Sequence, residues 1–219
     1  MVDDHRQRIL LAAARVYAVQ GWRGATTRRI AEEAGVNEVT LFRQFGSKEA
    51  LLDLMMHECS RIDEAAILPR EPSEPGAELL HWVSAHHAGL SGRRAMVRQM
   101  MSDAEERPDA GHCAAHNASS AAAHLREYVV QRRRHGWILA GDEITPTEVR
   151  AAVTLLMGAV FADAMNRDIM PMLYTEPLDD TLRAYVRIFL RGIGAPKEPV
   201  ALRERTVDRL PSSTFPFSV

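Results

Sequence analysis

The stretch from residue 26 to residue 48 concentrates side chains whose chemistry suits nucleic acid. Guanidinium and ammonium groups bind phosphate, and arginine also forms paired hydrogen bonds with guanine. Hydroxyl and amide groups add hydrogen bonds to phosphate oxygens. Side chains of these kinds are Thr27, Arg28, Arg29, Arg43, Gln44 and Lys48. If the fold collects them on one face, that face can bind DNA.

Local signals predict a short helix over residues 27–34. Thr26 is a good N-cap, because its hydroxyl can accept a hydrogen bond from a backbone N–H of the first turn. The apolar residues Ile30 and Ala34 lie one turn apart and share a face. Gly35 follows at the point where a helix commonly ends in a left-handed residue.

A second short helix is predicted over residues 38–44. Asn37 is a good N-cap for it, and Leu41 and Phe45 face inward together. Gly46 ends this helix. Two helices joined by a short turn that contains glycine form a helix-turn-helix unit, which presents its second helix to the major groove of DNA. The alternative is an ordinary helical hairpin that binds no DNA, and the basic side chains favour DNA binding.

The stretch resembles the DNA-binding signature of the TetR (tetracycline repressor) family of bacterial transcriptional regulators. The resemblance covers roughly residues 6–55 and is specific in residue type, order and spacing. Beyond it, the chain is similar to the family in length and helical layout. The matching residues are Thr26-Thr27-Arg28, Ile30-Ala31, Ala34-Gly35-Val36, Thr40-Leu41-Phe42, Phe45 and Ser47-Lys48-Glu49.

The resemblance implies roles for the residues of a DNA-binding surface. Arg28 is expected to contact a base, and guanine is the expected base because it is the commonest specific partner of arginine. Arg43 is expected to contact a base or a phosphate. The side chains of Thr27, Gln44 and Lys48 are expected to hold phosphates. The full set expected to bind DNA is Thr27, Arg28, Asn37, Glu38, Val39, Thr40, Phe42, Arg43, Gln44 and Lys48.

Two residues depart from the family pattern. Phe42 stands where the family most often has tyrosine, so a phosphate contact by that hydroxyl is missing. Glu38 places a carboxylate within the reading surface, where it repels phosphate but can accept a hydrogen bond from N4 of cytosine. Glu38 is therefore either a specificity residue or a solvated acid that interacts favourably with the helix dipole.

The composition is that of a soluble globular protein, with 46% hydrophobic and 26% charged residues among 219. The first five residues are polar and acidic, which predicts no secretory signal peptide. No apolar run reaches the ~18 residues of a membrane span. Cys59 and Cys113 are too few for a disulfide framework. A cytoplasmic location is expected from these features.

The net charge of −2 is unevenly distributed along the chain. Residues 1–50 hold eight Lys and Arg against six Asp and Glu, a balance of +2, which leaves −4 for the rest. A basic N-terminal part on an acidic remainder is typical of a protein that touches DNA at one end only.

Helical periodicity of apolar residues continues beyond the helix-turn-helix unit. No segment alternates apolar and polar residues as a strand does, so the predicted class is all-α. The expected organisation is a three-helix DNA-binding domain over residues 1–47, a helical ligand-binding and dimerisation domain over 48–194, and a flexible tail over 195–219. The clearest helix start is the capping box at Thr145 and Glu148, with proline at the first helical position. The other helices are expected at about 4–20, 48–66, 75–88, 93–103, 108–135, 145–167 and 178–191. Gly21 is expected to end the first of these, and Gly89 and Gly92 the helix over 75–88.

The last two long helices are expected to form a homodimer. They are apolar over much of their circumference, Gly158 permits close approach, and two such pairs would make a four-helix bundle. The alternative is that these residues form internal core alone. The residues expected at the dimer interface are Val153, Leu156, Met157, Val160, Leu182, Tyr185, Val186 and Phe189.

Methionine and aromatic residues in the central part predict a small-molecule pocket, because methionine adapts to irregular shapes. For any single residue, plain core is the alternative, and the resemblance to a ligand-gated family supports the set as a whole. No cofactor is expected beyond an effector of unknown identity. The expected pocket residues are Trp82, His86, Met96, Met100, Met101, His116, Tyr128, Phe161 and Met165.

The function predicted is a ligand-responsive repressor that binds a palindromic operator as a homodimer and is released by a small molecule. One alternative is a metal-responsive regulator that uses His112, Cys113 and His116, since histidines four residues apart share a helix face. The other is a helical enzyme or an adaptor whose three-helix head binds no DNA. Catalytic motifs such as GxSxG, a P-loop or HExxH are absent from the sequence, which favours a protein that is not an enzyme.

Overall fold

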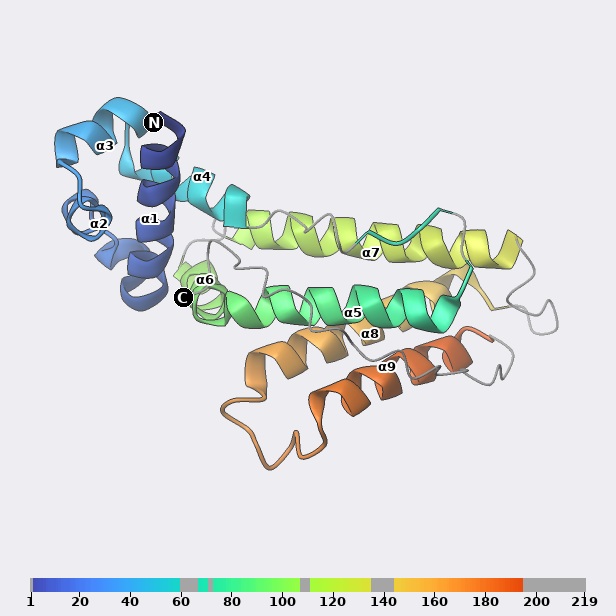
Figure 1. Cartoon of the computed structure of the whole chain (residues 1–219). Coiled ribbons are helices and arrows are strands. Elements are labelled where there is room, and N and C mark those ends of the chain that lie inside the picture. The colour runs from blue at the N-terminus through green and yellow to red at the C-terminus, as the bar shows by residue number, and fades with distance from the viewer. Residues whose placement is uncertain (1, 60–66, 71–72, 107–110, 135–143, 195–219) are drawn as a thin grey trace. The chain divides into compact units, whose positions relative to one another are not determined.

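A computed structural model describes residues 2–59, 67–70, 73–106, 111–134 and 144–194 of the chain. Within these ranges every regular element is an α-helix, which confirms the predicted all-α class (Figure 1). The expected tail after Gly194 and the expected continuation of a helix beyond Cys59 lie outside the described residues. Among the residues described, no helix is long and apolar enough to cross a membrane.

The helices of the described residues fall into two compact units. The first unit contains α1 to α4 and α6, and the second contains α5, α8, α9 and most of α7. Since α4 and α6 both pack on α1, the first unit extends beyond residues 1–47. The bounds are α1 Val2–Gly24, α2 Thr27–Ala34, α3 Glu38–Phe45, α4 Lys48–Cys59, α5 Pro75–Gly92, α6 Arg94–Glu106, α7 Gly111–Arg134, α8 Pro146–Asn166 and α9 Leu178–Gly192.

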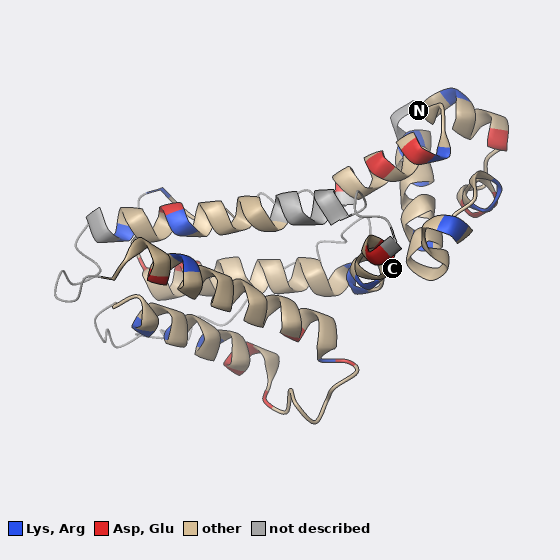
Figure 2. Ribbon diagram, turned by 180° about the vertical axis from the view of Figure 1, so that it is seen from behind, with Lys and Arg blue, Asp and Glu red and all other residues tan. Residues whose placement is uncertain are grey.

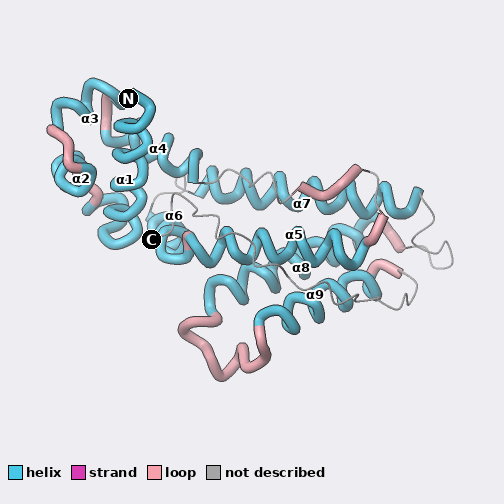
Figure 3. The backbone as a smooth tube through the Cα atoms, viewed as in Figure 1, coloured by secondary structure: helices cyan, strands magenta, loops and turns pink. Residues whose placement is uncertain are grey.

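The caps predicted for the two shortest helices are present. The Thr26 hydroxyl accepts a hydrogen bond from the backbone N–H of Arg29 at 3.3 Å, and Asn37 Oδ1 accepts one from the N–H of Val39 at 2.9 Å. Gly35 ends α2 with a left-handed φ of 63°. The connections between α2, α3 and α4 are short, as the tube in Figure 3 shows.

A single apolar core holds the first unit together. Helix α1 contributes fully buried Ile9 and Tyr17, and the two short helices contribute Ile30 and Leu41. Helices α4 and α6 close the core with residues such as Leu51, Leu52, Met55, Met56, Met96 and Met100. Helix α2 packs on α1, and α3 packs on α2 and α4, so burial of their inner faces fixes both short helices in the core of the first unit.

Helix α1 is interrupted at Gly21, as the sequence predicts. Its φ of 64° and ψ of −174° are not helical, and a last turn runs on to Gly24. The break frees the backbone N–H of Trp22, which donates to Asp103 Oδ2 at 3.0 Å, while the Tyr17 hydroxyl donates to the same oxygen at 2.7 Å. Asp103 on α6 therefore ties that helix to the interrupted end of α1.

The second unit is a set of long helices around its own apolar core (Figure 1). Helices α5, α7, α8 and α9 each contribute buried residues, among them Val83, Leu125, Val153 and Val186. The predicted capping box is present at the start of α8, where the side chains of Thr145 and Glu148 bond to each other's backbone N–H.

The prediction that Gly89 breaks a helix is wrong. Helix α5 continues through Gly89 to Gly92, and Gly89 is buried inside the unit. An interior glycine costs a helix only about 1 kcal/mol relative to alanine, so tertiary packing of the rest of α5 outweighs it.

The substitution Gly21→Ala is expected to destabilise the first unit by about 1–3 kcal/mol, since this backbone conformation is essentially restricted to glycine. An added Cβ would also lie 2.6 Å from Gln99 Nε2, which is itself held by Asp103 at 2.9 Å. Gly46→Ala is the matched control, because φ is 78° there but an added Cβ meets nothing within 4 Å. Urea unfolding should show a larger loss of unfolding free energy for Gly21→Ala. An equal loss in the two variants would mean that contact with α6 adds nothing.

Candidate nucleic-acid interface

Helix α3 exposes one side and buries the other in the core of the first unit, hereafter the head. Leu41 is buried in the core, whereas the opposite side presents Val39 at 72% and Phe42 at 46% exposure. Arg43 is also exposed, and Thr40 is half-buried. A face that combines apolar groups with a guanidinium can contact thymine methyl groups, base edges and phosphate.

The first turns of α2 and α3 are joined by a side-chain hydrogen bond. The Thr27 hydroxyl donates to Glu38 Oε1 at 2.5 Å, and both side chains are partly buried. Asn37 uses its side chain as the cap of α3. The cap by Asn37 is the one that the sequence predicts, whereas the bond between Thr27 and Glu38 is a partner that the sequence did not reveal.

The arginines of α2 point in different directions. Arg28 is exposed and pairs with Glu32 one turn away, with Nε 3.0 Å from Oε1. Arg29 turns back toward α1 and donates to the carbonyl of Gly24 at 3.1 Å and to Gln20 Oε1 at 3.2 Å. An exposed ion pair contributes little, about 0–1 kcal/mol, so a phosphate or a base can replace Glu32 as the partner of Arg28.

Two residues expected to hold phosphates are engaged within the head. Lys48 Nζ donates to the carbonyl of Trp22 at 2.5 Å and lies 5.6 Å from the centre of the Trp22 ring. Gln44 is half-buried, and none of the described residues donates a hydrogen bond to its buried Oε1. Contact with phosphate therefore requires Lys48 to exchange or extend its present contacts, and it requires the half-buried Gln44 to turn outward.

Acidic and basic residues alternate over the head, as the ribbon coloured by charge shows (Figure 2). Besides the Arg28–Glu32 pair, Arg15 of α1 pairs with Glu33 of α2, with Nε 2.7 Å from Oε1. These pairs leave the positive ends of the α2 and α3 dipoles and the exposed Arg43 as sources of positive potential.

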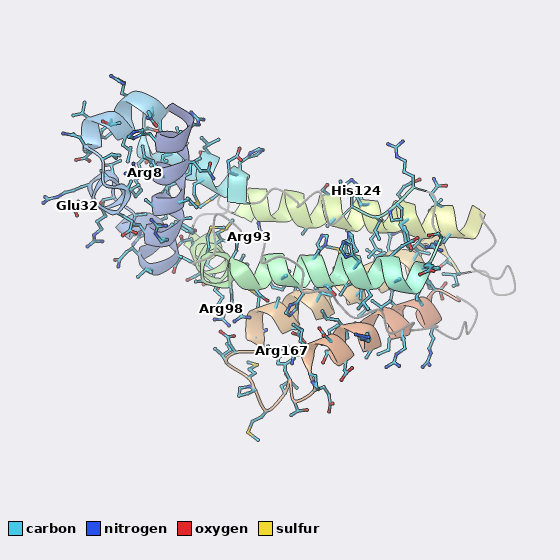
Figure 4. The ribbon with its side chains drawn as sticks, viewed as in Figure 1. Arg8, Glu32, Arg93, Arg98, His124 and Arg167 are labelled. Atoms are coloured by element: carbon cyan, nitrogen blue, oxygen red, sulfur yellow. The ribbon has the colours of Figure 1, made fainter. Side chains whose placement is uncertain are left out.

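Arg8 is a residue of the head that the sequence did not single out. It projects from α1 and donates to the carbonyl of Ala34 at 2.7 Å, at the end of α2 (Figure 4). The last carbonyls of a helix lack internal partners, so a guanidinium there stabilises the helix end. No local pattern links two residues that lie 26 positions apart, and the contact exists only because α1 packs behind α2.

The residues expected to line a pocket are divided between the two units. Met96 and Met100 belong to the core of the first unit, whereas Trp82 and Tyr128 belong to the core of the second. Met101 is 55% exposed. In the second unit, Met165 is also buried and Phe161 is half-buried, while the Trp82 and His86 rings lie 3.9 Å apart. The side chain of His116 lies outside the described residues.

Tyr128 belongs to a buried polar cluster that joins α5 and α7. Its hydroxyl donates to Glu78 Oε2 at 2.5 Å, and Arg132 donates to the same oxygen at 2.5 Å. Burial and the hydrogen bond to Glu78 raise the pKa of Tyr128. Burial opposes ionisation of Glu78, but hydrogen bonds from Tyr128 and from backbone N–H groups outweigh it and lower the pKa of Glu78.

A second buried cluster surrounds Asp163 on α8. His87 Nε2 lies 2.9 Å from Asp163 Oδ1, and Arg167 forks onto both carboxylate oxygens at 2.8 and 2.7 Å. Arg167 also donates to the carbonyl of Glu176 at 2.7 Å, so it fastens the connection between α8 and α9 (Figure 4). Burial by itself disfavours the charged carboxylate, but the hydrogen bonds from Arg167 and His87 outweigh it and lower the pKa of Asp163.

Most residues expected at a dimer interface pack inside the second unit. Met157 and Tyr185 are half-buried, and the other six are buried in the unit's own core. The solvent-facing side of the two helices instead shows Leu155 at 74% and Ile188 at 66% exposure. The six buried residues are Val153, Leu156, Val160, Leu182, Val186 and Phe189.

The side chains of His112, Cys113 and His116, named for a metal-responsive alternative, lie outside the described residues. Within the described part of the chain, no group of three or more His, Cys, Asp or Glu side chains is placed to hold a metal ion.

The N-terminal part of the chain matches a known family, and one relative extends the likeness over most of the chain. Residues 9–55 match the sequence profile of bacterial regulatory proteins of the tetR family. YvkB, an uncharacterized HTH-type transcriptional regulator of Bacillus subtilis, is 25% identical over 190 residues, which are 86% of this chain and 97% of YvkB.

Two further likenesses concern a part of the chain and its fold. The HTH-type transcriptional repressor AcnR of Corynebacterium glutamicum is 42% identical over 62 residues, which are 28% of this chain and 33% of AcnR. The crystal structure of a TetR-family transcriptional regulator from Mesorhizobium loti has the same fold, with a TM-score of 0.67 and 20% identity over 88% of this chain and 98% of that one. The matched family and these relatives are transcriptional regulators rather than enzymes, in agreement with the prediction that the chain is not an enzyme.

Stability of the second unit should depend on pH through Asp163. Because its pKa is lowered in the folded chain, the carboxylate stabilises the fold above its ordinary pKa of 3.8, and this contribution is lost as the pH falls through the lower folded value. Asp163→Asn should lower the unfolding free energy near neutral pH, on the order of 3 kcal/mol for a broken buried ion pair.

Urea unfolding between about pH 3 and pH 7 tests this, and the loss of stability at the acid end should be smaller in Asp163→Asn than in the unmodified protein. Asp53→Asn, which removes an exposed carboxylate from α4, is the control and should change neither quantity much. A similar acid response in Asp163→Asn would contradict the role of this carboxylate.

Proposed function

Because the chain belongs to the TetR family of bacterial transcriptional regulators, we propose that it represses transcription by binding a palindromic operator as a homodimer. The observation that carries this proposal is the capped helix α3, with its outer face of Val39, Phe42 and Arg43 exposed and its inner face buried in the core of the first unit. That arrangement holds a short helix in a defined orientation, as insertion into the major groove requires.

In the proposed complex, α3 enters the major groove and α2 crosses the backbone. Thr40 and Val39 meet base edges or a thymine methyl, and Arg43 reaches a base or a phosphate. Arg28 exchanges Glu32 for guanine, which offers two acceptors to a guanidinium. The N-terminal ends of both helices add positive potential near the phosphates. As a bacterial transcriptional regulator, the protein would act in the cytoplasm.

The homodimer is proposed to form on the exposed sides of α8 and α9. Leu155 and Ile188 are large apolar residues that face solvent in the single chain. Gly158 on α8 leaves open space, so a partner helix can approach its backbone closely. A dimer also meets a need of recognition, since one short helix reads few bases and two half-sites about 34–36 Å apart, or a multiple of that distance, supply the specificity.

The effector is proposed to bind in the second unit, where Trp82, His86, Tyr128, Phe161 and Met165 supply apolar and aromatic surface. The dimer is proposed to have two conformations that differ in the spacing of their heads. A small molecule that binds one conformation more tightly than the other would shift the equilibrium toward it. Only about 1–3 kcal/mol of coupling is needed for a useful response. Release from DNA by the ligand is the proposed direction of control.

Lys48→Ala should weaken binding to operator and to random duplexes alike and should reduce the salt slope by about one. The operator is first isolated by selection from a random pool of duplexes, and binding is then titrated at several salt concentrations. Arg126→Ala, which removes a basic residue of α7, is the control and should leave the slope unchanged. If the unmodified protein shows no sequence preference, DNA recognition itself is contradicted. An unchanged slope for Lys48→Ala would remove only Lys48 from the phosphate contacts.

Gly158→Leu should leave the single chain folded but weaken the dimer. An added Cβ meets nothing within 4 Å inside the chain, whereas a leucine would hold a partner helix away from α8. Sedimentation velocity should show a shift from dimer to monomer, and operator affinity should fall with it. Gly158→Ala, which also removes the helical glycine but adds a single methyl group, serves as the comparison and should weaken the dimer less than Gly158→Leu does. A dimer of unchanged strength in Gly158→Leu would place the interface elsewhere.

A further inference from the structure

The hydrogen bond between Thr27 and Glu38 spans the turn of the helix-turn-helix unit. Thr27 is the first residue of α2 and Glu38 the first residue of α3, so the bond joins the two helix starts directly. The donor–acceptor distance is 2.5 Å, which is the short range expected when a hydroxyl donates to a charged carboxylate. One residue of the reading helix is thereby held by a residue of the supporting helix.

This bond commits the only proton of the Thr27 hydroxyl. A threonine hydroxyl has one hydrogen to donate, and in this head it is directed at Glu38 Oε1. A phosphate oxygen accepts hydrogen bonds and donates none, so Thr27 cannot serve phosphate and Glu38 with the same proton. The expected phosphate contact of Thr27 therefore competes with the bond that the structure shows.

Glu38 is fixed from its backbone as well as from its side chain. Asn37 caps the first turn of α3 through the N–H of Val39, which sets the direction in which the neighbouring Glu38 leaves the helix. Thr27 then holds Oε1, and a carboxylate has a second oxygen, Oε2, with further acceptor capacity. The bond from Thr27 thus restricts the rotamers of a side chain that would otherwise be flexible, and the Asn37 cap holds the backbone from which that side chain projects.

A carboxylate at this place favours one kind of partner on DNA. It repels phosphate and accepts hydrogen bonds only, so in the major groove its natural partner is an exocyclic amino group. Cytosine offers N4–H₂ there, and glutamate commonly accepts from it. Adenine also has an amino group, but the adjacent N7 is an acceptor and opposes a carboxylate.

We propose that Glu38 is a specificity-determining residue that selects cytosine at one position of each half-site, and that Thr27 is the positioning residue that aims its carboxylate. This inference rests on the proposed DNA-binding function. Binding strips water from the carboxylate, and a base without an amino group leaves it buried and unpaired. Discrimination at this position therefore comes chiefly from the penalty for wrong bases.

The test is selection of duplexes from a random pool with four proteins of full length. The unmodified protein should prefer cytosine at one half-site position by on the order of 10-fold. Glu38→Gln should shift that position toward adenine, whose N6 and N7 match an amide, and leave the other positions unchanged. Thr27→Val keeps the shape of the side chain without the hydroxyl and should lose most of the cytosine preference at the same position. Thr27→Ser keeps the hydroxyl and should retain it.

Controls separate positioning from charge and from folding. Glu33→Gln removes a carboxylate of α2 that pairs with Arg15 and should change affinity for all sequences alike. Thermal unfolding of each variant reports whether the head is folded, and Glu38→Gln tests the specificity role independently of the Thr27 variants.

Three results would overturn the inference. If Thr27→Val weakens all duplexes equally and leaves the preference for cytosine intact, Thr27 is an uncharged phosphate contact and does not position Glu38. If Glu38→Gln selects the same half-site as the unmodified protein, Glu38 does not determine specificity. If the unmodified protein selects no sequence, the proposed function fails and the specificity role fails with it, which is distinct from the first two results.

Discussion

The structure of the head depends on the shortness of the two helices that would meet DNA. Helices α2 and α3 have eight residues each, and isolated helices of that length are not stable in water. Their geometry is therefore imposed by the surroundings: inner faces buried in the core that they share with α1 and α4, caps at both N-termini, and Arg8 on the carbonyl of Ala34 at the end of α2. Any contact that holds α1 in place consequently also holds the reading surface.

Next to the interruption of α1 at Gly21, the backbone of Trp22 connects α1 to both α6 and α4. The N–H of Trp22 donates to Asp103 of α6, and its carbonyl accepts from Lys48 of α4. A continuous helix would have used the Trp22 N–H internally, so the break at Gly21 frees this donor, whereas the Trp22 carbonyl lies in the last turn of α1, where carbonyls lack internal partners. Because Lys48 is also expected to bind phosphate, the side chain that would grip DNA is anchored at the place where α6 fastens α1.

Local signals sufficed to predict the caps of α2, α3 and α8, the αL glycine after α2 and the all-α class, because each depends on neighbouring residues alone. Partners far apart in the chain could not be predicted in this way. Glu38 was foreseen as a possible reader, but its bond to Thr27 requires the two helix starts to meet. The methionines of α6 looked like pocket residues, yet Met96 and Met100 fill the head core, since composition does not reveal which unit a helix joins.

The small positive net charge of residues 1–50, which include α2 and α3, makes base reading important. Residues 1–50 carry a formal balance of +2, from eight basic and six acidic residues, and Arg15 and Arg28 already pair with glutamates of α2. Few phosphates can then be neutralised by each head, and nonspecific attraction to DNA, which scales with that number, is limited. A carboxylate such as Glu38 lowers it further while penalising wrong bases. A head of this kind gains selectivity at the expense of general affinity, and in the proposed homodimer a second head on the same operator would restore the strength that a single one lacks.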